Sequence, residues 1–80
     1  MYRTDKYTII LWGKTISRYG VMDIHELTRR HADTMKESKT VAKYLMSSEY
    51  ARSCETDDLN WIRCDINDIT DQCIIDYWRD

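Results

Sequence analysis

The side chains best suited to metal binding or nucleophilic catalysis are two histidines and three cysteines: His25, His31, Cys54, Cys64 and Cys73. Zinc sites usually hold ligands two to four residues apart, as in Cys-x-x-Cys, whereas at least five residues separate each member of this set from the next. Covalent catalysis needs a histidine beside its nucleophile, and no spacing joins a histidine to a cysteine. We therefore expect no metal, no cofactor and no catalytic residue, so the expected function is not enzymatic.

Two further stretches resemble binding loops in part. Gly13-Lys14-Thr15 matches the end of a phosphate-binding loop, but the first glycine of that loop would fall at Thr8. The aspartates that follow Asp65 resemble a calcium loop, but the glycine needed at its sixth position is Thr70. A two-residue turn, with glycine first as in type II′ hairpins, explains Gly13-Lys14 better.

The clearest period in the chain lies between residues 57 and 78. Six side chains fall at steps of three and four, which places them on one stripe of a helix: Leu59, Ile62, Ile66, Ile69, Cys73 and Tyr77. The rest of that helix would combine aspartates with large apolar residues: Asp58, Trp61, Asp65, Asp68, Asp71, Ile75, Asp76 and Trp78. Because aspartate is a poor helix former, this acidic face predicts docking on a basic partner surface.

A basic stripe offers the alternative site. On a helix its members would lie on neighbouring faces and could follow a phosphate backbone: His25, Arg29, Arg30, Lys36, Lys39 and Lys43. A small DNA-binding regulator is therefore the second hypothesis. The net charge of −2 weighs against it, as does Glu26 among the residues that would contact bases.

The elements that would position these residues form a small α+β domain over residues 1–80. The β-branched and aromatic run from Tyr7 to Trp12 predicts a strand, and Asp23 with Glu26 has the spacing of a helix capping box. We expect a β-hairpin packed against two or three helices, with strands at about 4–12 and 15–21 and helices at about 23–36, 40–52 and 58–78. One long helix over 23–51, and a third strand at 61–66, are the alternatives.

The expected core combines one face of the hairpin with the helix stripes: Ile9, Leu11, Ile16, Ile24, Leu27, Met35, Leu45, Leu59, Ile62, Ile66, Ile69 and Cys73. A chain of 80 residues buries a modest core, which makes a homodimer an open alternative. Charge is divided along the chain, because residues 1–45 hold nine Lys/Arg and five Asp/Glu, and residues 46–80 hold three and nine.

No apolar run reaches the length of a signal-peptide core or a membrane span, and three unpaired-looking cysteines favour a reducing cytoplasm. These properties suggest a non-enzymatic protein-binding module. We expect an accessory protein of a phage or mobile element, of anti-CRISPR or anti-restriction type. It would inhibit a host nucleic-acid-handling complex by binding a basic host protein through the acidic helix.

Overall fold

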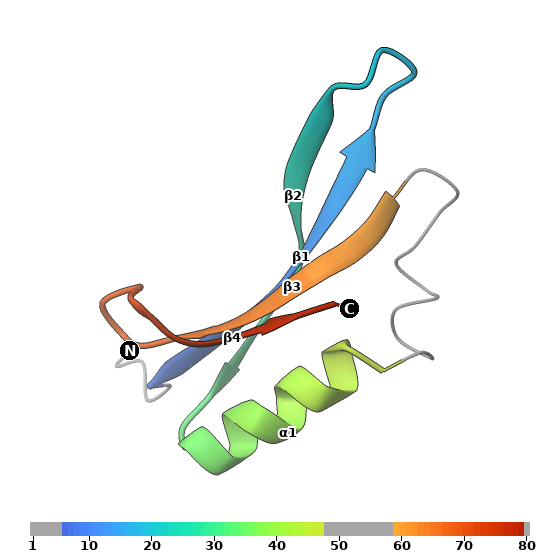
Figure 1. Ribbon diagram of the computed structural model, residues 1–80. Coiled ribbons are helices and arrows are strands. Elements are labelled where there is room, and N and C mark those ends of the chain that lie inside the picture. The colour runs from blue at the N-terminus through green and yellow to red at the C-terminus, as the bar shows by residue number, and fades with distance from the viewer. Residues whose placement is uncertain (1–5, 48–58, 80) are drawn as a thin grey trace.

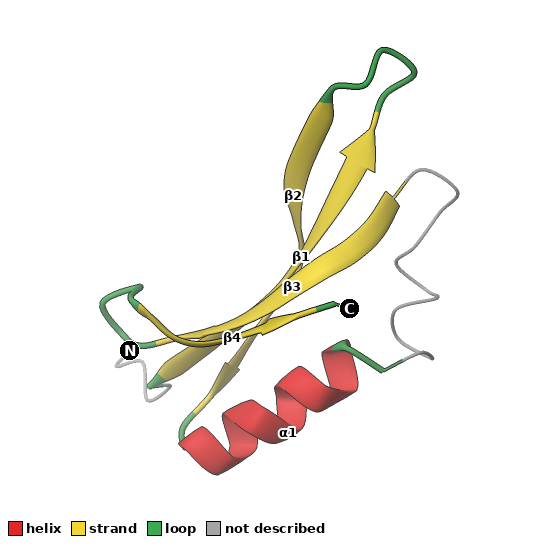
Figure 2. Cartoon of the chain, viewed as in Figure 1, coloured by secondary structure: helices red, strands yellow, loops and turns green. Residues whose placement is uncertain are grey.

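The computed structural model describes residues 6–47 and 59–79, and these form an antiparallel sheet with one helix on it (Figures 1 and 2). In chain order the elements are β1 (Tyr7–Ile16), β2 (Met22–Ala32), α1 (Met35–Leu45), β3 (Leu59–Asn67) and β4 (Cys73–Trp78). The strands lie in the order β2-β1-β3-β4, so β1 and β3 are internal and β2 and β4 are the two edges.

Strand β1 lies inside the sheet because its sequence is apolar on both faces. Ile9, Ile10 and Leu11 are consecutive and are each at most 4% exposed, which only a strand covered on both sides achieves. Ile9 pairs with Arg30 of β2 and with Ile66 of β3. The two neighbours thereby satisfy the backbone hydrogen-bonding groups of β1 along both of its edges.

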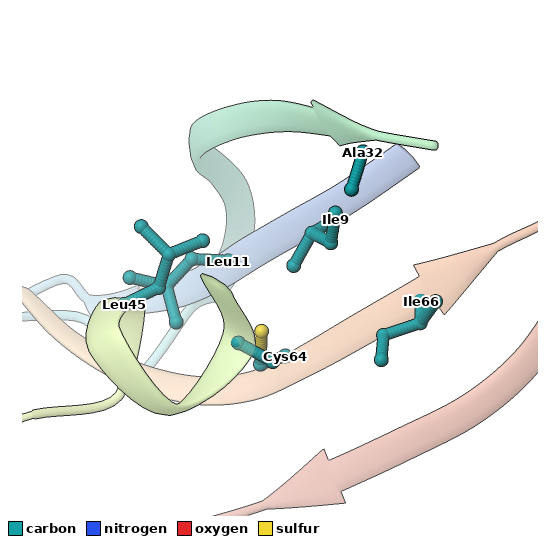
Figure 3. Packing of buried hydrophobic residues seen from close by; sticks show 7 residues of the cluster. Ile9, Leu11, Ala32, Leu45, Cys64 and Ile66 are labelled. Carbon is teal, nitrogen blue, oxygen red and sulfur yellow. The ribbon is translucent and has the colours of Figure 1, made fainter. Parts of the chain in front are cut away.

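Helix α1 covers one face of the sheet and closes the core (Figure 3). Its buried residues, Ser38, Ala42 and Leu45, follow the helical period, and the first two are small enough to let the helix approach β1 closely. Leu45 packs with Ile9, Leu11, Ala32, Cys64 and Ile66. Ser38 stays satisfied in this apolar setting because its hydroxyl donates to the Thr34 carbonyl at 2.8 Å.

The start of α1 is set by a capping box in which Thr34 caps the helix. The Thr34 hydroxyl accepts a hydrogen bond from the Glu37 backbone N–H at 3.1 Å, and the Glu37 carboxylate accepts one from the Asp33 N–H at 3.3 Å. This Thr-x-x-Glu signal is plain in the sequence, and it places the start of the helix about twelve residues later than the Asp23–Glu26 spacing did.

The two β-hairpins turn in the same way. Ser17 and Asp68 each open a three-residue loop, and their side chains accept hydrogen bonds from the backbone N–H groups two and four residues on. The last loop residue has a positive φ, 79° at Gly20 and 64° at Asp71. This is the arrangement of a type I turn followed by a left-handed residue, and it connects antiparallel strands without splaying them.

The predicted hairpin with two or three helices is wrong. β1 runs straight through Gly13-Lys14, the turn follows at 17–21, and the segment predicted as helix 23–36 is mostly strand β2. The predicted helix 58–78 consists of β3, a turn and β4, so the alternative strand at 61–66 lies within β3. Of the predicted helix 40–52, residues 40–45 belong to α1 and residues 48–52 lie outside the described range.

Strand pairing explains these corrections. The apolar residues at helical spacing in 22–32 are mostly exposed, so they form no buried helix face. This segment is a strand instead, because it pairs with one edge of β1 and satisfies the backbone of β1 there. The predicted core is right at Ile9, Leu11, Leu45 and Ile66, and Leu27 and Met35 pack against it. Four expected core residues are exposed instead: Ile16, Ile24, Ile69 and Cys73. Ile62 is half-buried, and the Leu59 side chain lies outside the described residues.

A double irregularity beside Gly13 bends the sheet. The register between β1 and β2 shifts after Leu11, and the register between β1 and β3 shifts after Trp12. Leu27 is the extra residue of β2 at this bulge, and its side chain lies over Gly13. A Cβ added there would lie 2.8 Å from the Leu27 Cδ1. The Leu27 side chain therefore occupies the space that a Cβ at position 13 would need, which explains a glycine inside a strand.

We predict that Gly13→Ala destabilises the protein by about 1–3 kcal/mol, because the new methyl group overpacks Leu27. Urea unfolding measures the change. In a Leu27→Ala background the same substitution should be neutral or slightly stabilising, since alanine suits a strand better than glycine by about 0.5–1 kcal/mol. Equal costs in both backgrounds would contradict the packing explanation.

Candidate functional site

The face of the sheet opposite α1 is uncovered among the described residues, and we call it the open face. Strand pairing places Thr8, Ile10 and Trp12 of β1 there, opposite side chains of both neighbouring strands. Ile10 is only 4% exposed although no element of the described chain packs over it. Long polar and aromatic side chains must therefore cover it, and these give the open face its chemistry.

The centre of this cover is a guanidinium between two indoles. The Arg63 Cζ lies 5.5 Å from the ring centroid of Trp12 and 5.2 Å from that of Trp78, because the three residues stand side by side on β1, β3 and β4. Each such cation–π contact contributes about 0.5–2 kcal/mol, depending on desolvation. The stack ties the edge strand β4 to the middle of the sheet.

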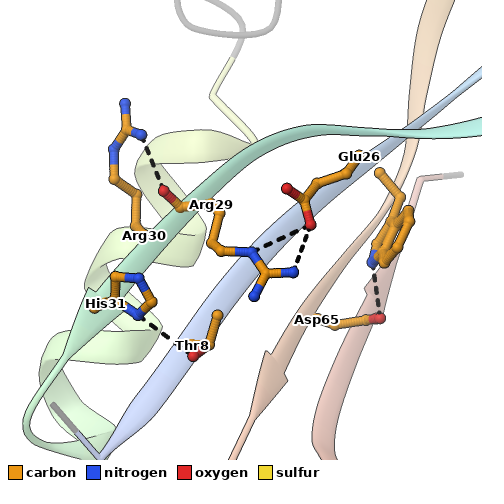
Figure 4. A network of polar contacts seen from close by, with 7 residues as sticks. Thr8, Glu26, Arg29, Arg30, His31 and Asp65 are labelled. Atoms are coloured by element: carbon orange, nitrogen blue, oxygen red, sulfur yellow. Dashed lines mark hydrogen bonds and ion pairs between the residues drawn. The ribbon is translucent and has the colours of Figure 1, made fainter. Parts of the chain in front are cut away.

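Asp65 is the buried charge of the open face, at 7% exposed. Its Oδ2 accepts a hydrogen bond from the Trp12 Nε1 at 3.1 Å (Figure 4). Its Oδ1 faces the Arg63 Nε at 3.0 Å as an ion pair that lacks the alignment of a hydrogen bond. Burial raises the pKa of Asp65 above its usual value, and the Arg63 charge and the Trp12 hydrogen bond offset part of that increase.

The β2 side of the open face carries its own polar contacts (Figure 4). Glu26 and Arg29 form a salt bridge at 2.7 Å, with both side chains more than a third exposed. The Thr8 Oγ1 and the His31 Nδ1 lie 3.4 Å apart. Exposed pairs of this kind contribute little stability, so their effect here is to cover Thr8 and Ile10.

Along the other edge, exposed apolar side chains alternate with exposed aspartates, and Asp76 accepts a hydrogen bond from the Trp78 Nε1 at 2.9 Å. We call this set the β4-side surface: Ile69, Asp71, Ile74, Asp76 and Trp78. All five are exposed, and the three apolar members are 75%, 47% and 58% exposed in that order. The turn supplies the first two, and the side chains of 74, 76 and 78 alternate along β4. Large apolar residues flanked by carboxylates are typical of a protein-binding surface.

The structure divides the predicted acidic helix face. Asp71, Asp76 and Trp78 are exposed along the β4 edge, where Asp76 and Trp78 are in contact, but Asp65 is buried and Asp68 shapes the turn. Trp61 and Ile75 pack against the core on the helix side of the sheet. Asp58 lies outside the described residues. The acidic helix face is therefore wrong as geometry, because the period-two alternation of strands sorts these residues differently.

The predicted basic stripe also falls on two elements. His25, Arg29 and Arg30 belong to β2, whereas Lys36, Lys39 and Lys43 are exposed on α1. Arg29 and Arg30 point to opposite faces of the sheet because they are consecutive in a strand, and Arg29 is engaged by Glu26. The three lysines are the part of the stripe that shares one helix side.

The two described thiols are poorly suited to nucleophilic chemistry, and Cys54 lies outside the described residues. Cys64 is fully buried, and burial raises its pKa to about 12. Cys73 is exposed, but partial desolvation and the nearby Asp65 and Asp76 carboxylates raise its pKa as well. In residues 6–47 and 59–79 no group of three His, Cys, Asp or Glu side chains is placed to hold a metal ion.

Comparisons with protein-family models, curated proteins and solved structures found no match for this chain. Helix α1 is too short and too polar to cross a membrane, and the described residues contain no other helix. The structure therefore defines a class by architecture alone, a ββαββ domain with one open sheet face. Its site must be argued from its own residues.

We predict that Arg63→Ala destabilises the protein by about 3 kcal/mol near neutral pH, because it leaves the buried Asp65 carboxylate without its counter-charge. The substitution should raise the pKa of Asp65 further. A carboxyl whose folded-state pKa exceeds its unfolded value destabilises the fold above that pKa, so the variant should regain stability as pH falls through it. Urea unfolding at a series of pH values measures both effects.

The control is Arg63→Ala with Asp65→Asn, which removes the unpaired charge and keeps an oxygen that can accept from Trp12. This double variant should recover most of the lost stability and show no added pH dependence. If it stayed as unstable as Arg63→Ala, the cost would come from the lost indole stacking rather than from the charge.

We also predict slow alkylation of both described cysteines. With iodoacetamide at mildly alkaline pH, Cys64 should stay unmodified while the protein is folded, and Cys73 should react more slowly than it does in denaturant, because its thiolate is disfavoured. Mass spectrometry of peptides follows each site. A Cys73 that reacts faster in the folded protein would show an activated thiol and contradict this account.

Proposed function

We propose that this protein is a non-enzymatic binding module that docks on a basic surface of another protein through its β4-side surface. The supporting observation is that Trp78 and Ile74 are exposed on the same edge strand as the exposed Asp76, with Asp71 exposed in the turn that precedes the strand. Carboxylates steer a basic partner during encounter, and large apolar side chains anchor it once in contact. The stack on Arg63 orients the Trp78 indole, which lowers the entropy lost on binding.

The chemistry of the surface favours a particular class of partner. Basic protein surfaces with space for an aromatic ring are typical of proteins that hold nucleic acid. We propose a component of a nucleic-acid-handling complex as the partner, inhibited when this chain occupies that surface, as a phage or mobile-element accessory protein would do. The free thiols of Cys64 and Cys73 support a reducing compartment such as the cytoplasm.

The structure decides which substitutions test this function. Asp65 and Asp68 are unsuitable because one is buried against Arg63 and the other accepts three hydrogen bonds within its turn. Asp71 has a φ of 64°, so a lysine there would add backbone strain. Asp76 and Ile69 are both exposed. Asp76 also accepts a hydrogen bond from the Trp78 Nε1 at 2.9 Å, so its replacement removes both a carboxylate and a contact that orients the indole, whereas Ile69 tests the apolar contact alone.

We predict that Asp76→Lys and Ile69→Lys each weaken binding of the partner by about tenfold, or about 1.4 kcal/mol. The tagged chain is incubated with lysate of the source cell, with and without nuclease treatment, and bound proteins are identified and quantified by mass spectrometry. The matched control is Asp33→Lys, the same charge reversal at an exposed site between β2 and α1. A partner of the β4-side surface is retained by the wild type and the control and lost from both test variants.

Two outcomes would overturn the proposal. Retention of every bound protein by Asp76→Lys and Ile69→Lys would show that the β4-side surface is not the site. Loss of all binding on nuclease treatment would favour the DNA-regulator alternative, with Lys36, Lys39 and Lys43 as the residues to reverse. Binding of that kind should weaken steeply with salt concentration.

A further inference from the structure

The β1–β2 hairpin extends past the rest of the sheet and ends far from α1 (Figure 1). Its end carries five large apolar side chains that are all more than half exposed: Ile16, Tyr19, Val21, Met22 and Ile24. An exposed apolar group of this size on a small domain marks an interaction site. Ile16, Met22 and Ile24 share one face, because Ile16 pairs with Met22 and strand residues alternate between faces.

The edge of β2 beside this apolar group is unpaired within the described part of the chain. Its straight portion runs from Met22, where the strand leaves the turn, to Glu26, where the Leu27 bulge begins. The backbone of Ser17 donates to the Val21 carbonyl at 2.9 Å, and antiparallel pairs alternate from there. Met22, Ile24 and Glu26 therefore direct their backbone N–H and C=O groups outward.

We propose that a second copy of this chain pairs with the segment Met22–Glu26, antiparallel, about a two-fold axis at Ile24. The pairing would join two four-stranded sheets into one continuous sheet. The turn and the bulge limit the usable edge to five residues, and Ile24 is its centre. A two-fold axis makes the same segment serve both copies, which is how most homodimers are built.

Complementary hydrogen-bonding groups favour this register over its neighbours, because an imidazole N–H can donate to a carboxylate. The His25 Nε2 lies 3.2 Å from the Thr15 Oγ1, which leaves the Nδ1 for Asp23 of the other copy. With Ile24 opposite Ile24, Asp23 of each copy lies opposite His25 of the other, in the non-hydrogen-bonded pairs where side chains lie closest. A shift of the axis to Asp23 would oppose two carboxylates, and a shift to His25 would oppose two imidazoles. On the other sheet edge, β4, an axis at Asp76 would likewise oppose two carboxylates.

The test measures molecular mass by light scattering during size-exclusion chromatography, from micromolar to millimolar chain concentration. The wild type should shift from monomer to dimer over this range. Ile24→Lys should raise the dimer dissociation constant by about tenfold or more, because the register places the two new charges opposite each other. Circular dichroism confirms that the variant is folded. The control is Ile74→Lys on β4, whose side chain is 47% exposed against 51% for Ile24, and it should leave the dimer unchanged.

A mixture of Ile24→Lys and Ile24→Glu tests the axis itself. Each variant alone should be monomeric, and their mixture should form a heterodimer, since only an axis at Ile24 brings the two substituted residues together. The proposal is overturned if the wild type stays monomeric at every concentration, if Ile24→Lys dimerises normally, or if the mixture stays monomeric. These outcomes do not depend on the β4-side surface, which lies on the opposite edge.

Discussion

The fold depends on one constraint: β1 has apolar side chains on both faces that must be buried, and backbone groups on both edges that must be hydrogen-bonded. Three consecutive buried residues, Ile9, Ile10 and Leu11, cannot all be hidden by a hairpin that packs on helices from one side. Strands β2 and β3 satisfy the backbone of β1, and α1 covers Ile9 and Leu11. Ile10 is left on the opposite face, and the open face is organised around it.

The open face shows how a single-layer sheet can bury an apolar residue without a second layer. Trp12, Arg63 and Trp78 stack across three strands, and Asp65 neutralises the guanidinium and accepts from the Trp12 indole. Because Asp65 is buried, removing Arg63 would leave a buried carboxylate without its counter-charge, which costs more than the intact pair contributes. The same stack holds Trp78 at the β4 edge of the sheet. The residues that cover Ile10 therefore also expose an aromatic ring to solvent.

The two sheet edges have opposite character. Edge β2 is long, carries apolar residues at its far end and is interrupted by the Leu27 bulge, whereas edge β4 is short and acidic. Natural proteins protect exposed edges by charge, shortness or bulges, and β4 uses the first two. The portion of β2 between its turn and its bulge also carries Asp23 and Glu26, but pairing about Ile24 places neither carboxylate opposite another, and this distinguishes it as an edge suited to pairing.

The sequence by itself determined the strand at Tyr7–Trp12 and several core residues. It also contained the Thr34–Glu37 capping signal and matching turn signals at Ser17 and Asp68. Tertiary structure decided that residues 22–32 and 59–78 are strands, because β1 and β3 supply long-range partners that local periodicity cannot report. It also decided which aspartates are exposed: Asp65 and Asp76 lie opposite each other on the same face, but Asp65 stands on the internal strand β3 and is buried in an ion pair, whereas Asp76 stands on the edge strand β4 and is exposed.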